Sequence, residues 1–309
     1  MADAPVDLPD FFIVGAAKSG TTSAHYYLDQ HPDACMPTQK EPRYFSFVDA
    51  PPNFAGPSNL DNSVTRLEDY LALFQCPGTA TRRGDASPSY LYLYEDTIHN
   101  MERVYGADAL SRVRIVIFLR QPADRAWSQY WTFQRIFQET LPFEKAIKPE
   151  TIEQRLQQNW NVFYNYLVFG NYAAQVRAYL ERFGRDNVRV YLFEDLIRDP
   201  KVFCSSLFEF VGVDPAFQPG DLKAFNVSGR AKNERLVKSL LAQSSLKTMF
   251  KKLVGKKQRD KLRNYLSRRL FKKVAQPNEL KQALTQYYSD DIDALAELIR
   301  RDLSHWKKV

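Results

Sequence analysis

The chain alternates between short apolar runs and longer segments with helical periodicity. Three apolar runs predict buried strands over Phe11–Val14, Val113–Leu119 and Val188–Phe193, and two weaker runs predict strands over Ala34–Met36 and Ala80–Gly84. Strands without a regular polar face are typical of a parallel sheet whose two faces are both covered. We therefore expect a sheet buried between layers of helices.

Between the strands, apolar residues recur at the spacing of helices that pack on a core. Thr65 and Glu68 have the spacing of a capping box, and Asp199 before Pro200 that of an N-cap followed by a first-turn proline. The predicted helices cover Thr22–Gln30, Thr65–Phe74, Thr97–Tyr105, Ala123–Phe133, Tyr172–Phe183 and Pro200–Val211. This alternation predicts an α/β fold of three layers, with a central parallel sheet flanked by helices.

The last part of the chain is predicted to be helical without further strands. Residues 239–309 are first basic and then amphipathic, the second stretch covering Tyr287–Leu303. We predict that residues 1–309 form a single domain, with residues 239–309 as its helical, basic C-terminal extension.

The composition is typical of a soluble globular protein. Of the 309 residues, 44% are hydrophobic and 26% are charged, which is enough apolar material for one large α/β domain. The chain shows no signal-peptide pattern, and the apolar run at residues 11–14 is far shorter than the ~20 residues of a membrane-spanning helix. We therefore expect no transmembrane segment.

Cysteine and histidine are scarce and scattered. Cys35, Cys76 and Cys204 are far apart, odd in number and without CxxC spacing, so the sequence predicts neither a disulfide framework nor a zinc site. The four histidines are not at metal-ligand spacing, which favours an activity without a metal. The cysteine pattern favours a reducing, cytoplasmic location.

The positive charge of the chain is concentrated in one segment. The net charge is +7, but between Lys247 and Lys273 twelve Lys and Arg residues stand against a single acid, Asp260. This segment alone carries +11, which leaves about −4 for the rest of the chain. The segment is either a solvated helical face or a guide for an acidic acceptor such as a polysaccharide.

The first predicted strand leads into a candidate phosphate-binding loop. Gly15 and Gly20 have the spacing of the glycines in a Walker A loop, and a helix is predicted directly after them. At such a junction the free backbone N–H groups and the helix dipole favour an anion. The side chains that can add contacts to phosphate oxygens are those of Lys18, Ser19, Thr21, Thr22 and Ser23.

Two positions distinguish this loop from the loop of a kinase. Thr21 stands where a Walker A loop has its lysine, and a lysine appears early, as Lys18. The strand over Val113–Leu119 is followed by Arg120, where a Mg²⁺-binding aspartate would be expected. A P-loop nucleotide-dependent phosphotransferase is therefore an alternative hypothesis, and a non-catalytic polyanion-binding protein is another.

Two motifs stand at strand-to-helix junctions of the predicted fold: residues 12–23, and residues 115–128, in which Arg120 and Ser128 are eight residues apart. The first resembles the 5′-phosphosulfate loop, and the second the 3′-phosphate motif, of the family of sulfotransferases that use 3′-phosphoadenosine 5′-phosphosulfate (PAPS), in particular its bacterial and heparan-sulfate-type branch. The resemblance extends through Lys40–Phe45, Ser87–Tyr90, Glu194–Leu196 and Asp302–Trp306. It implies a P-loop-like fold, with PAPS as co-substrate and 3′-phosphoadenosine 5′-phosphate (PAP) as product.

The resemblance assigns donor-binding roles to both motifs. The loop residues that it implies as donor-binding are Lys18, Ser19, Gly20, Thr21, Thr22 and Ser23. Lys18 would also be catalytic, because its charge would stabilise the leaving phosphate without a metal. Arg120 and Ser128 would bind the 3′-phosphate, whereas Arg125 is interpreted as a helix-surface or salt-bridge residue.

The resemblance also has gaps. Ala86 stands where the heparan-type branch often has a lysine, and the paired cysteines and Lys-Gly-Arg loop of that branch are absent. Residues 228–232 take the place of that loop in our interpretation, with Arg230 or Lys232 reaching the donor phosphates.

The family also implies a catalytic base. In the heparan-type branch a glutamate follows the first helix and precedes an aromatic pair, and Glu41, ahead of Tyr44 and Phe45, has that position. A strand–helix–strand unit returns the chain to the same edge of a parallel sheet, so Glu41 can face the phosphate loop. Alternatively, Glu41 only caps a short helix, and Asp85 and His99 are the next candidates for the base.

The acceptor is less well defined than the donor. We expect a hydroxyl or amine of a saccharide or small metabolite, acidic acceptors included, and no nucleic acid. The sequence makes no prediction about the oligomeric state.

Overall fold

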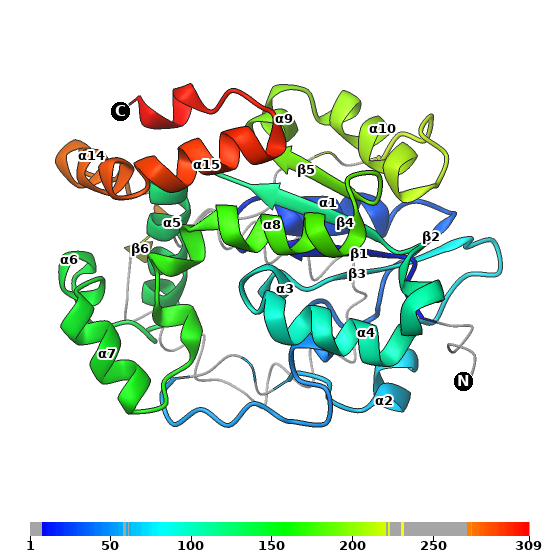
Figure 1. Cartoon of the computed structure of the whole chain (residues 1–309), viewed down its shortest axis with the longest axis horizontal. Coiled ribbons are helices and arrows are strands. Elements are labelled where there is room, and N and C mark those ends of the chain that lie inside the picture. Colours follow the sequence, from blue (N-terminus) through cyan, green and yellow to red (C-terminus); the bar gives the residue numbers. More distant parts are fainter. Residues whose placement is uncertain are drawn as a thin grey trace.

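The computed structural model describes residues 8–57, 60, 62–220, 222, 230–231, 271–272 and 274–308. Its centre is a five-stranded parallel sheet with the strand order β2-β3-β1-β4-β5 (Figure 1). The strands are β1 (Phe11–Gly15), β2 (Ala34–Cys35), β3 (Arg82–Ala86), β4 (Arg114–Leu119) and β5 (Val188–Leu192). Each strand overlaps the apolar run that predicted it, so the predicted sheet is confirmed.

Helices connect the strands and follow the last one. The α-helices before the C-terminal part are α1 (Thr21–Leu28), α2 (Leu67–Leu71), α3 (Ser89–Tyr92), α4 (Tyr94–Leu110), α5 (Pro122–Arg135), α6 (Phe143–Ala146), α7 (Pro149–Gln157), α8 (Tyr172–Phe183), α9 (Phe193–Arg198) and α10 (Pro200–Val211). Short 3₁₀ helices are η1 (Tyr44–Ser46), η2 (Val162–Tyr164) and η3 (Val168–Gly170). Two of the predicted helices, α8 and α10, have the predicted ends.

The two faces of the sheet belong to two separate apolar clusters, because successive strand residues point to opposite sides. In β1, Phe11 and Ile13 pack with side chains of α1 and α10, whereas Phe12 and Val14 pack with side chains of α3, α4 and α8. The same alternation runs through β4, whose Val116 faces the first cluster. The result is a helix–sheet–helix arrangement, visible in Figure 1, which confirms the predicted three-layer α/β fold.

Helix capping follows the sequence at one of the two predicted positions. The Asp199 side chain accepts hydrogen bonds from the backbone N–H groups of Lys201 and Val202 and so caps α10. The predicted capping box at Thr65 is wrong: α2 begins two residues later, and the N–H of Asp49 donates to the Thr65 carbonyl instead.

The described C-terminal residues pack on the sheet domain as helices. They form α14 (Asn278–Tyr287), α15 (Ser289–Ile299) and the 3₁₀ helix η4 (Ser304–Lys307), and α15 contacts α8 while α14 contacts α5. A small antiparallel pair, β6 (Arg230–Ala231) with β7 (Phe271–Lys272), was not predicted. The basic segment from Lys247 to Lys273 lies outside the described residues, except for Phe271 and Lys272.

A disulfide joins Cys35, at the end of β2, to Cys76, and Cys204 is free and buried. The prediction that no cysteines pair is therefore wrong. The spacing of cysteines in the sequence does not tell which of them the fold brings together, and these two are 41 residues apart. Disulfides persist in oxidising environments, so the cysteines no longer favour a reducing compartment.

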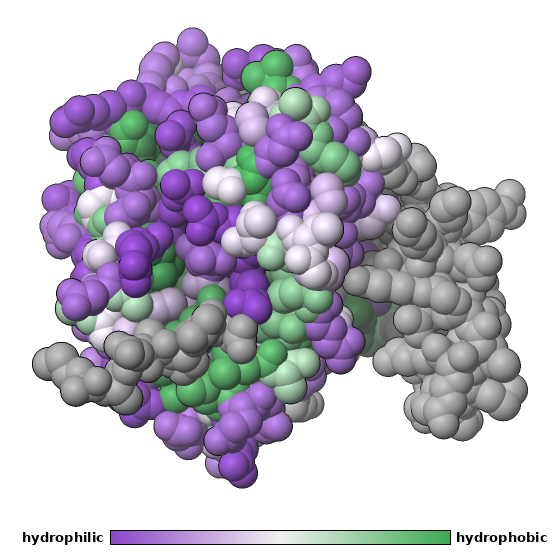
Figure 2. Space-filling model, turned by 90° about the vertical axis from the view of Figure 1, so that its right-hand side faces the viewer, coloured by the Kyte–Doolittle hydropathy of each residue, from purple (hydrophilic) through white to green (hydrophobic). Residues whose placement is uncertain are grey.

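On the face shown in Figure 2, polar and charged residues predominate, and the largest continuous apolar area lies in the lower part of the view. Over the described part of the chain, no helix is long and apolar enough to cross a membrane.

Candidate active site

The candidate phosphate loop connects β1 to α1. Gly20 is the N-cap residue of α1 and has a φ of 102°, which glycine adopts without strain. A Cβ atom at this position would also lie 2.8 Å from Cδ2 of Leu196. Lys18 has a φ of 73°, an uncommon left-handed conformation for a residue with a side chain. The loop is therefore a tightly specified turn that ends at a helix N-terminus, as predicted.

The second motif lies directly beside this loop, because β4 is the neighbour of β1. Arg120 follows β4, donates a hydrogen bond from Nη1 to the Lys18 carbonyl at 3.4 Å, and lies 4.8 Å from the ring centre of Phe193. The Tyr172 hydroxyl donates to the Arg120 carbonyl. Ser128 lies in the second turn of α5, the helix that begins at Pro122. Burial lowers the pKa of Arg120, and its carboxylate neighbours oppose this shift.

The third part of the site is the turn that carries Glu41. Glu41 and Arg43 have φ values of 58° and 59°, so two residues with side chains adopt the left-handed region within three positions. Glu41 Oε1 lies 2.5 Å from Lys40 Nζ, and Glu41 Oε2 lies 3.1 Å from Arg43 Nη2. Arg43 also donates to Asn62 Oδ1. The carboxylate is held between two cations and does not merely cap η1, whose N-cap residue is Arg43.

A buried polar network holds the turn of Glu41 and Arg43 from the interior of the protein. Ser87 Oγ accepts the backbone N–H of Arg43 and donates to Asp85, whose other carboxylate oxygen accepts hydrogen bonds from Tyr70 and Tyr90. Burial raises the pKa of Asp85 to about 6, against the hydrogen bonds that it accepts. Because both of its oxygens are occupied inside the protein, Asp85 is poorly placed to act as a base.

The three parts meet around one cavity of about 220 Å³. The predicted residues that line it are Lys18, Gly20, Thr21, Thr22, Glu41, Arg120 and Ser128. Ser19 and Ser23 are buried and do not line it. Arg230 belongs to β6, which contacts α5, the helix of Ser128. His99 is an exposed residue of α4 and is not part of the cavity.

Several lining residues were not assigned a role in the site from the sequence. These are Arg43, Gln129, Thr132, Phe133, Phe163 and Phe193. Thr132 lies one helical turn after Ser128, so helical spacing could have indicated it. No comparable signal exists for Phe163, which reaches the cavity from a 3₁₀ helix far along the chain.

Burial and neighbouring charges shift the pKa values of both Lys18 and Glu41. Burial, together with the cations Arg135, Lys40 and Arg120, lowers the pKa of Lys18 to about 7, while Glu41 opposes this shift. For Glu41, burial raises the pKa, but Lys40, Arg43 and Lys18 outweigh burial and leave the pKa below its usual value. The site therefore favours an ionised carboxylate beside a lysine that is easily deprotonated.

Arg125 is the clearest departure from the predicted side-chain positions. Its side chain is completely buried, donates to the Tyr166 carbonyl and lies 5.5 Å from the ring centre of Phe169. The interpretation of Arg125 as a helix-surface or salt-bridge residue is wrong, because the segment after α7 folds over this face of α5.

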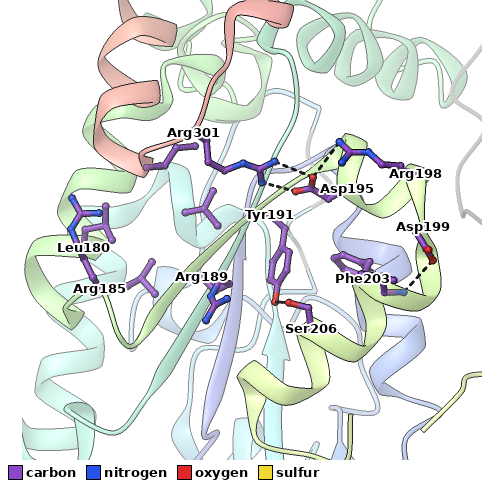
Figure 3. Close-up of a pocket in the computed structure, with 14 residues that line it drawn as sticks. Leu180, Arg185, Arg189, Tyr191, Asp195, Arg198, Asp199, Phe203, Ser206 and Arg301 are labelled. Carbon is purple, nitrogen blue, oxygen red and sulfur yellow. Dashed lines mark hydrogen bonds and ion pairs between the residues drawn. The ribbon is translucent and has the colours of Figure 1, made fainter. Parts of the chain in front are cut away.

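A larger cavity of about 500 Å³ lies elsewhere, beside β5, the last strand in the sheet order (Figure 3). It is bordered by α8, α10 and the segment after α15. The ion pair of Asp195 with Arg301 lies at its rim, with Arg301 nitrogens 2.6 and 3.0 Å from the carboxylate. None of the predicted site residues lines this cavity.

The fold and the smaller cavity together define a P-loop-like α/β protein with a cationic site at the carboxyl ends of its strands. A sulfotransferase domain family matches residues 8–288, and the chain belongs to this family. A crystal structure of a sulfotransferase from Alicyclobacillus acidocaldarius is similar over 98% of this chain and 100% of that one, with 32% identity and a TM-score of 0.75.

The curated relatives are more distant. The chain is 24% identical over 225 residues to human bifunctional heparan sulfate N-deacetylase/N-sulfotransferase 2, and the aligned region covers 67% of this chain and 22% of that protein. It is 28% identical over 123 residues to the membrane-associated sulfotransferase kil1 of Dictyostelium discoideum, and this aligned region covers 40% of this chain and 22% of that protein. The chain therefore spans about a fifth of the length of these relatives.

Proposed function

We propose that this sulfotransferase moves the sulfuryl group of PAPS to a hydroxyl or amine of a saccharide or small-metabolite acceptor. The observation that carries the proposal is the single cavity of about 220 Å³ that joins the loop of Lys18, the pair Arg120 and Ser128, and the carboxylate of Glu41. A donor with phosphate groups at both ends of a nucleoside needs two such anion sites, and an acceptor needs a base beside them.

The residues of the cavity fit the donor. The helix N-terminus after Gly20, with the hydroxyls of Thr21 and Thr22, provides donors for the 5′-phosphosulfate. Arg120 can bind the 3′-phosphate through two N–H groups, with Ser128 adding a hydroxyl. When bound, PAPS supplies an activated sulfuryl group with a phosphate as leaving group.

Two residues act on the reacting atoms in this proposal. Glu41 accepts the proton of the acceptor hydroxyl or amine while the acceptor forms its bond to sulfur. Lys18 stabilises the charge that develops on the leaving phosphate. An anion beside Lys18 favours its protonated form, so the donor itself raises the pKa of a lysine that is near 7 in the free protein.

The surroundings favour an anionic acceptor. Lys40, Arg43 and Arg135 add positive charge around the carboxylate of Glu41 and the amine of Lys18. The human relative and its mouse counterpart are heparan sulfate N-deacetylase/N-sulfotransferases, and heparan sulfate is an acidic polysaccharide, which supports a saccharide acceptor here as well. We further propose that residues 1–309 work as one domain, since the Arg301–Asp195 pair ties the C-terminal part to the sheet.

The residues at two diagnostic positions argue against a phosphotransferase. Thr21 replaces the Walker lysine, Arg120 replaces the Mg²⁺-binding acid, and the described residues contain no group of three His, Cys, Asp or Glu side chains that could hold a metal. We expect full activity in excess chelator. Loss of activity on chelation, restored by Mg²⁺, would favour the alternative.

Calorimetric titration with PAP, with AMP and ATP as controls, tests the donor. We expect PAP to bind more tightly than AMP, because only PAP can occupy both anion sites. Radiolabelled sulfuryl transfer from PAPS to a panel of sulfated, carboxylated and neutral saccharides then tests the acceptor. Equal binding of PAP and AMP, together with no transfer to any member of the panel, would reject the proposed function.

A further inference from the structure

Lys40 links the candidate base to the helix that follows the phosphate loop. Its Nζ atom lies 2.5 Å from Glu41 Oε1 and 3.0 Å from Thr22 Oγ1. Thr22 is the second residue of α1 and lines the same cavity as Glu41. The ammonium group of Lys40 is therefore held between the place expected for the 5′-phosphosulfate and the carboxylate expected to take the proton.

The two cations on Glu41 are held very differently. The Arg43 side chain is only 9% exposed, and its guanidinium is fixed by Asn62 as well as by Glu41. The Lys40 side chain is 34% exposed, and its other partner is the neutral hydroxyl of Thr22. Lysine carries its charge on a flexible four-carbon chain, whereas the arginine fork is rigid. Lys40 is therefore the movable cation and Arg43 the fixed one.

We propose that Lys40 is a second catalytic cation, which is bound to Glu41 before the reaction and transfers its hydrogen bond from Glu41 to the sulfuryl oxygens during it. The proposal rests on the proposed function and deepens it. It adds a residue that couples proton uptake by Glu41 to stabilisation of the negative charge at sulfur.

The step balances without any further reactant. The acceptor oxygen or nitrogen forms a bond to sulfur, and its proton goes to Glu41. The bond from sulfur to the bridging oxygen breaks, and its electron pair stays on the phosphate. Lys40 keeps its proton throughout. Once Glu41 is neutral it no longer attracts the Lys40 ammonium, which is then free to donate to the nearest anionic oxygens.

The pairing also sets how strong a base Glu41 is. The charged and titratable groups that face Glu41 are Lys40 and Arg43 on its own turn, Lys18 on the phosphate loop and Asp85 on β3. Removing an adjacent cation raises the pKa of a carboxylate. Replacing Lys40 with a neutral residue should therefore make Glu41 easier to protonate in the free protein, before any donor is bound.

The first experiment measures this ionisation directly. The infrared carboxylate band of Glu41 is isolated as the difference between each protein and the same protein with Glu41→Gln, and is titrated with pH in the absence of ligand. We expect Lys40→Gln to shift the midpoint upward by about one pH unit or more. Lys40→Arg should stay near the wild type, and Lys201→Gln, an exposed lysine on α10, is the matched control.

The second experiment separates catalysis from donor binding. For Lys40→Gln we expect kcat to fall ~100-fold, with the affinity for PAP measured by calorimetry changed less than about threefold. The acid limb of the pH profile of kcat/KM should move upward with the infrared midpoint, and Lys40→Arg should restore part of kcat. Thermal unfolding of all variants checks that they are folded.

Each other outcome overturns the proposal in a recognisable way. If PAP affinity falls as much as kcat, Lys40 is a phosphate-binding residue. If neither kcat nor the midpoint changes, Lys40 is a surface cation. If the wild-type protein neither binds PAP nor transfers a sulfuryl group, the proposed function fails and the catalytic role of Lys40 fails with it, whereas the infrared shift still reports the ion pair.

Discussion

The larger and the smaller cavity described above each hold an acid bound to an arginine, but the two acids have different surroundings. At the larger cavity beside β5, both oxygens of Asp195 accept from Arg301, and one of them also accepts the backbone N–H of Leu192 and so begins α9. At the smaller cavity, Glu41 is held by Lys40 and Arg43 and lines the hollow itself. Cavity size alone would therefore select a different site from the one that the charged residues favour.

The backbone distinguishes the two sites as clearly as the charges do. Lys18, Glu41 and Arg43 all have positive φ values, whereas at the larger cavity the residue with a side chain that does so is Arg300, between the lining residues Ile299 and Arg301. Such conformations cost of order 1 kcal/mol or more each and persist only where the surroundings enforce them. Here Ser87 and Asp85 hold the Arg43 turn in place. The clustered cations and the enforced turn conformations therefore favour the smaller cavity as the candidate site.

Neutralising Glu41 should have the largest effect on activity. Glu41→Gln keeps the shape but removes the basicity, so we expect kcat to drop ~10²- to 10⁴-fold with PAP affinity nearly unchanged. The measurement is steady-state sulfuryl transfer over a pH series. A variant that keeps more than a tenth of the wild-type kcat at its own optimal pH would exclude Glu41 as the base.

Arg120 tests whether the smaller cavity binds both ends of the donor. Arg120→Ala removes a charge-assisted contact of roughly 1.5–3 kcal/mol, so PAP affinity should fall ~10- to 100-fold. Affinity for an analogue without the 3′-phosphate should barely change, as measured by calorimetry. Equal weakening of both ligands would contradict the assignment of Arg120 to the 3′-phosphate.

The pH dependence of donor binding sharpens the role of Lys18. Because the pKa of Lys18 in the free protein is about 7, the amine loses its charge as pH rises above that value. Binding of an anion then requires uptake of a proton, so PAP affinity should decrease by up to ~10-fold per pH unit between about pH 7 and 9. Lys18→Met should bind weakly at all pH values and lose this dependence.

At the larger cavity the expected effect is on stability. Asp195→Asn should lower the free energy of unfolding by about 1–3 kcal/mol, because it weakens hydrogen bonds to a charged group, and should leave kcat within a few-fold. Burial raises the pKa of Asp195, but Arg301 and the Leu192 N–H outweigh it and leave the pKa lowered. The stability difference should therefore be complete near pH 7 and vanish as pH falls below the lowered pKa, under ~4. Denaturant unfolding at several pH values measures it, and a large loss of kcat would mean that the two cavities are coupled.

Much of the fold could be predicted because its signals are local. The buried strands β1, β4 and β5 are largely apolar runs, and a helix such as α8 has apolar residues at helical spacing, so these elements leave patterns in consecutive residues. The strand β3, with two arginines and an aspartate, carries a weaker signal. Lys18 and Arg120 could be expected at the same edge of the sheet, because each follows the carboxyl end of a parallel strand.

What could not be predicted depends on contacts between distant segments. Arg125 has the spacing of an exposed helix residue, and only the segment around Tyr166, 41 positions later, buries it. The support of the Arg43 turn by Asp85 and Ser87 likewise joins residues from different strands and loops. Polar residues give no sequence pattern that tells a buried network from a solvated surface.

The disulfide between Cys35 and Cys76 encloses Lys40, Glu41 and Arg43 within one covalent ring. A ring closed across 41 residues restricts the unfolded chain and favours the folded state by about 4 kcal/mol in the chain-entropy estimate. The stability of the domain that carries this turn thus depends on the redox conditions around the protein. Material made in a reducing bacterial cytosol and material made in an oxidising periplasm would share one sequence and differ in their free energy of unfolding.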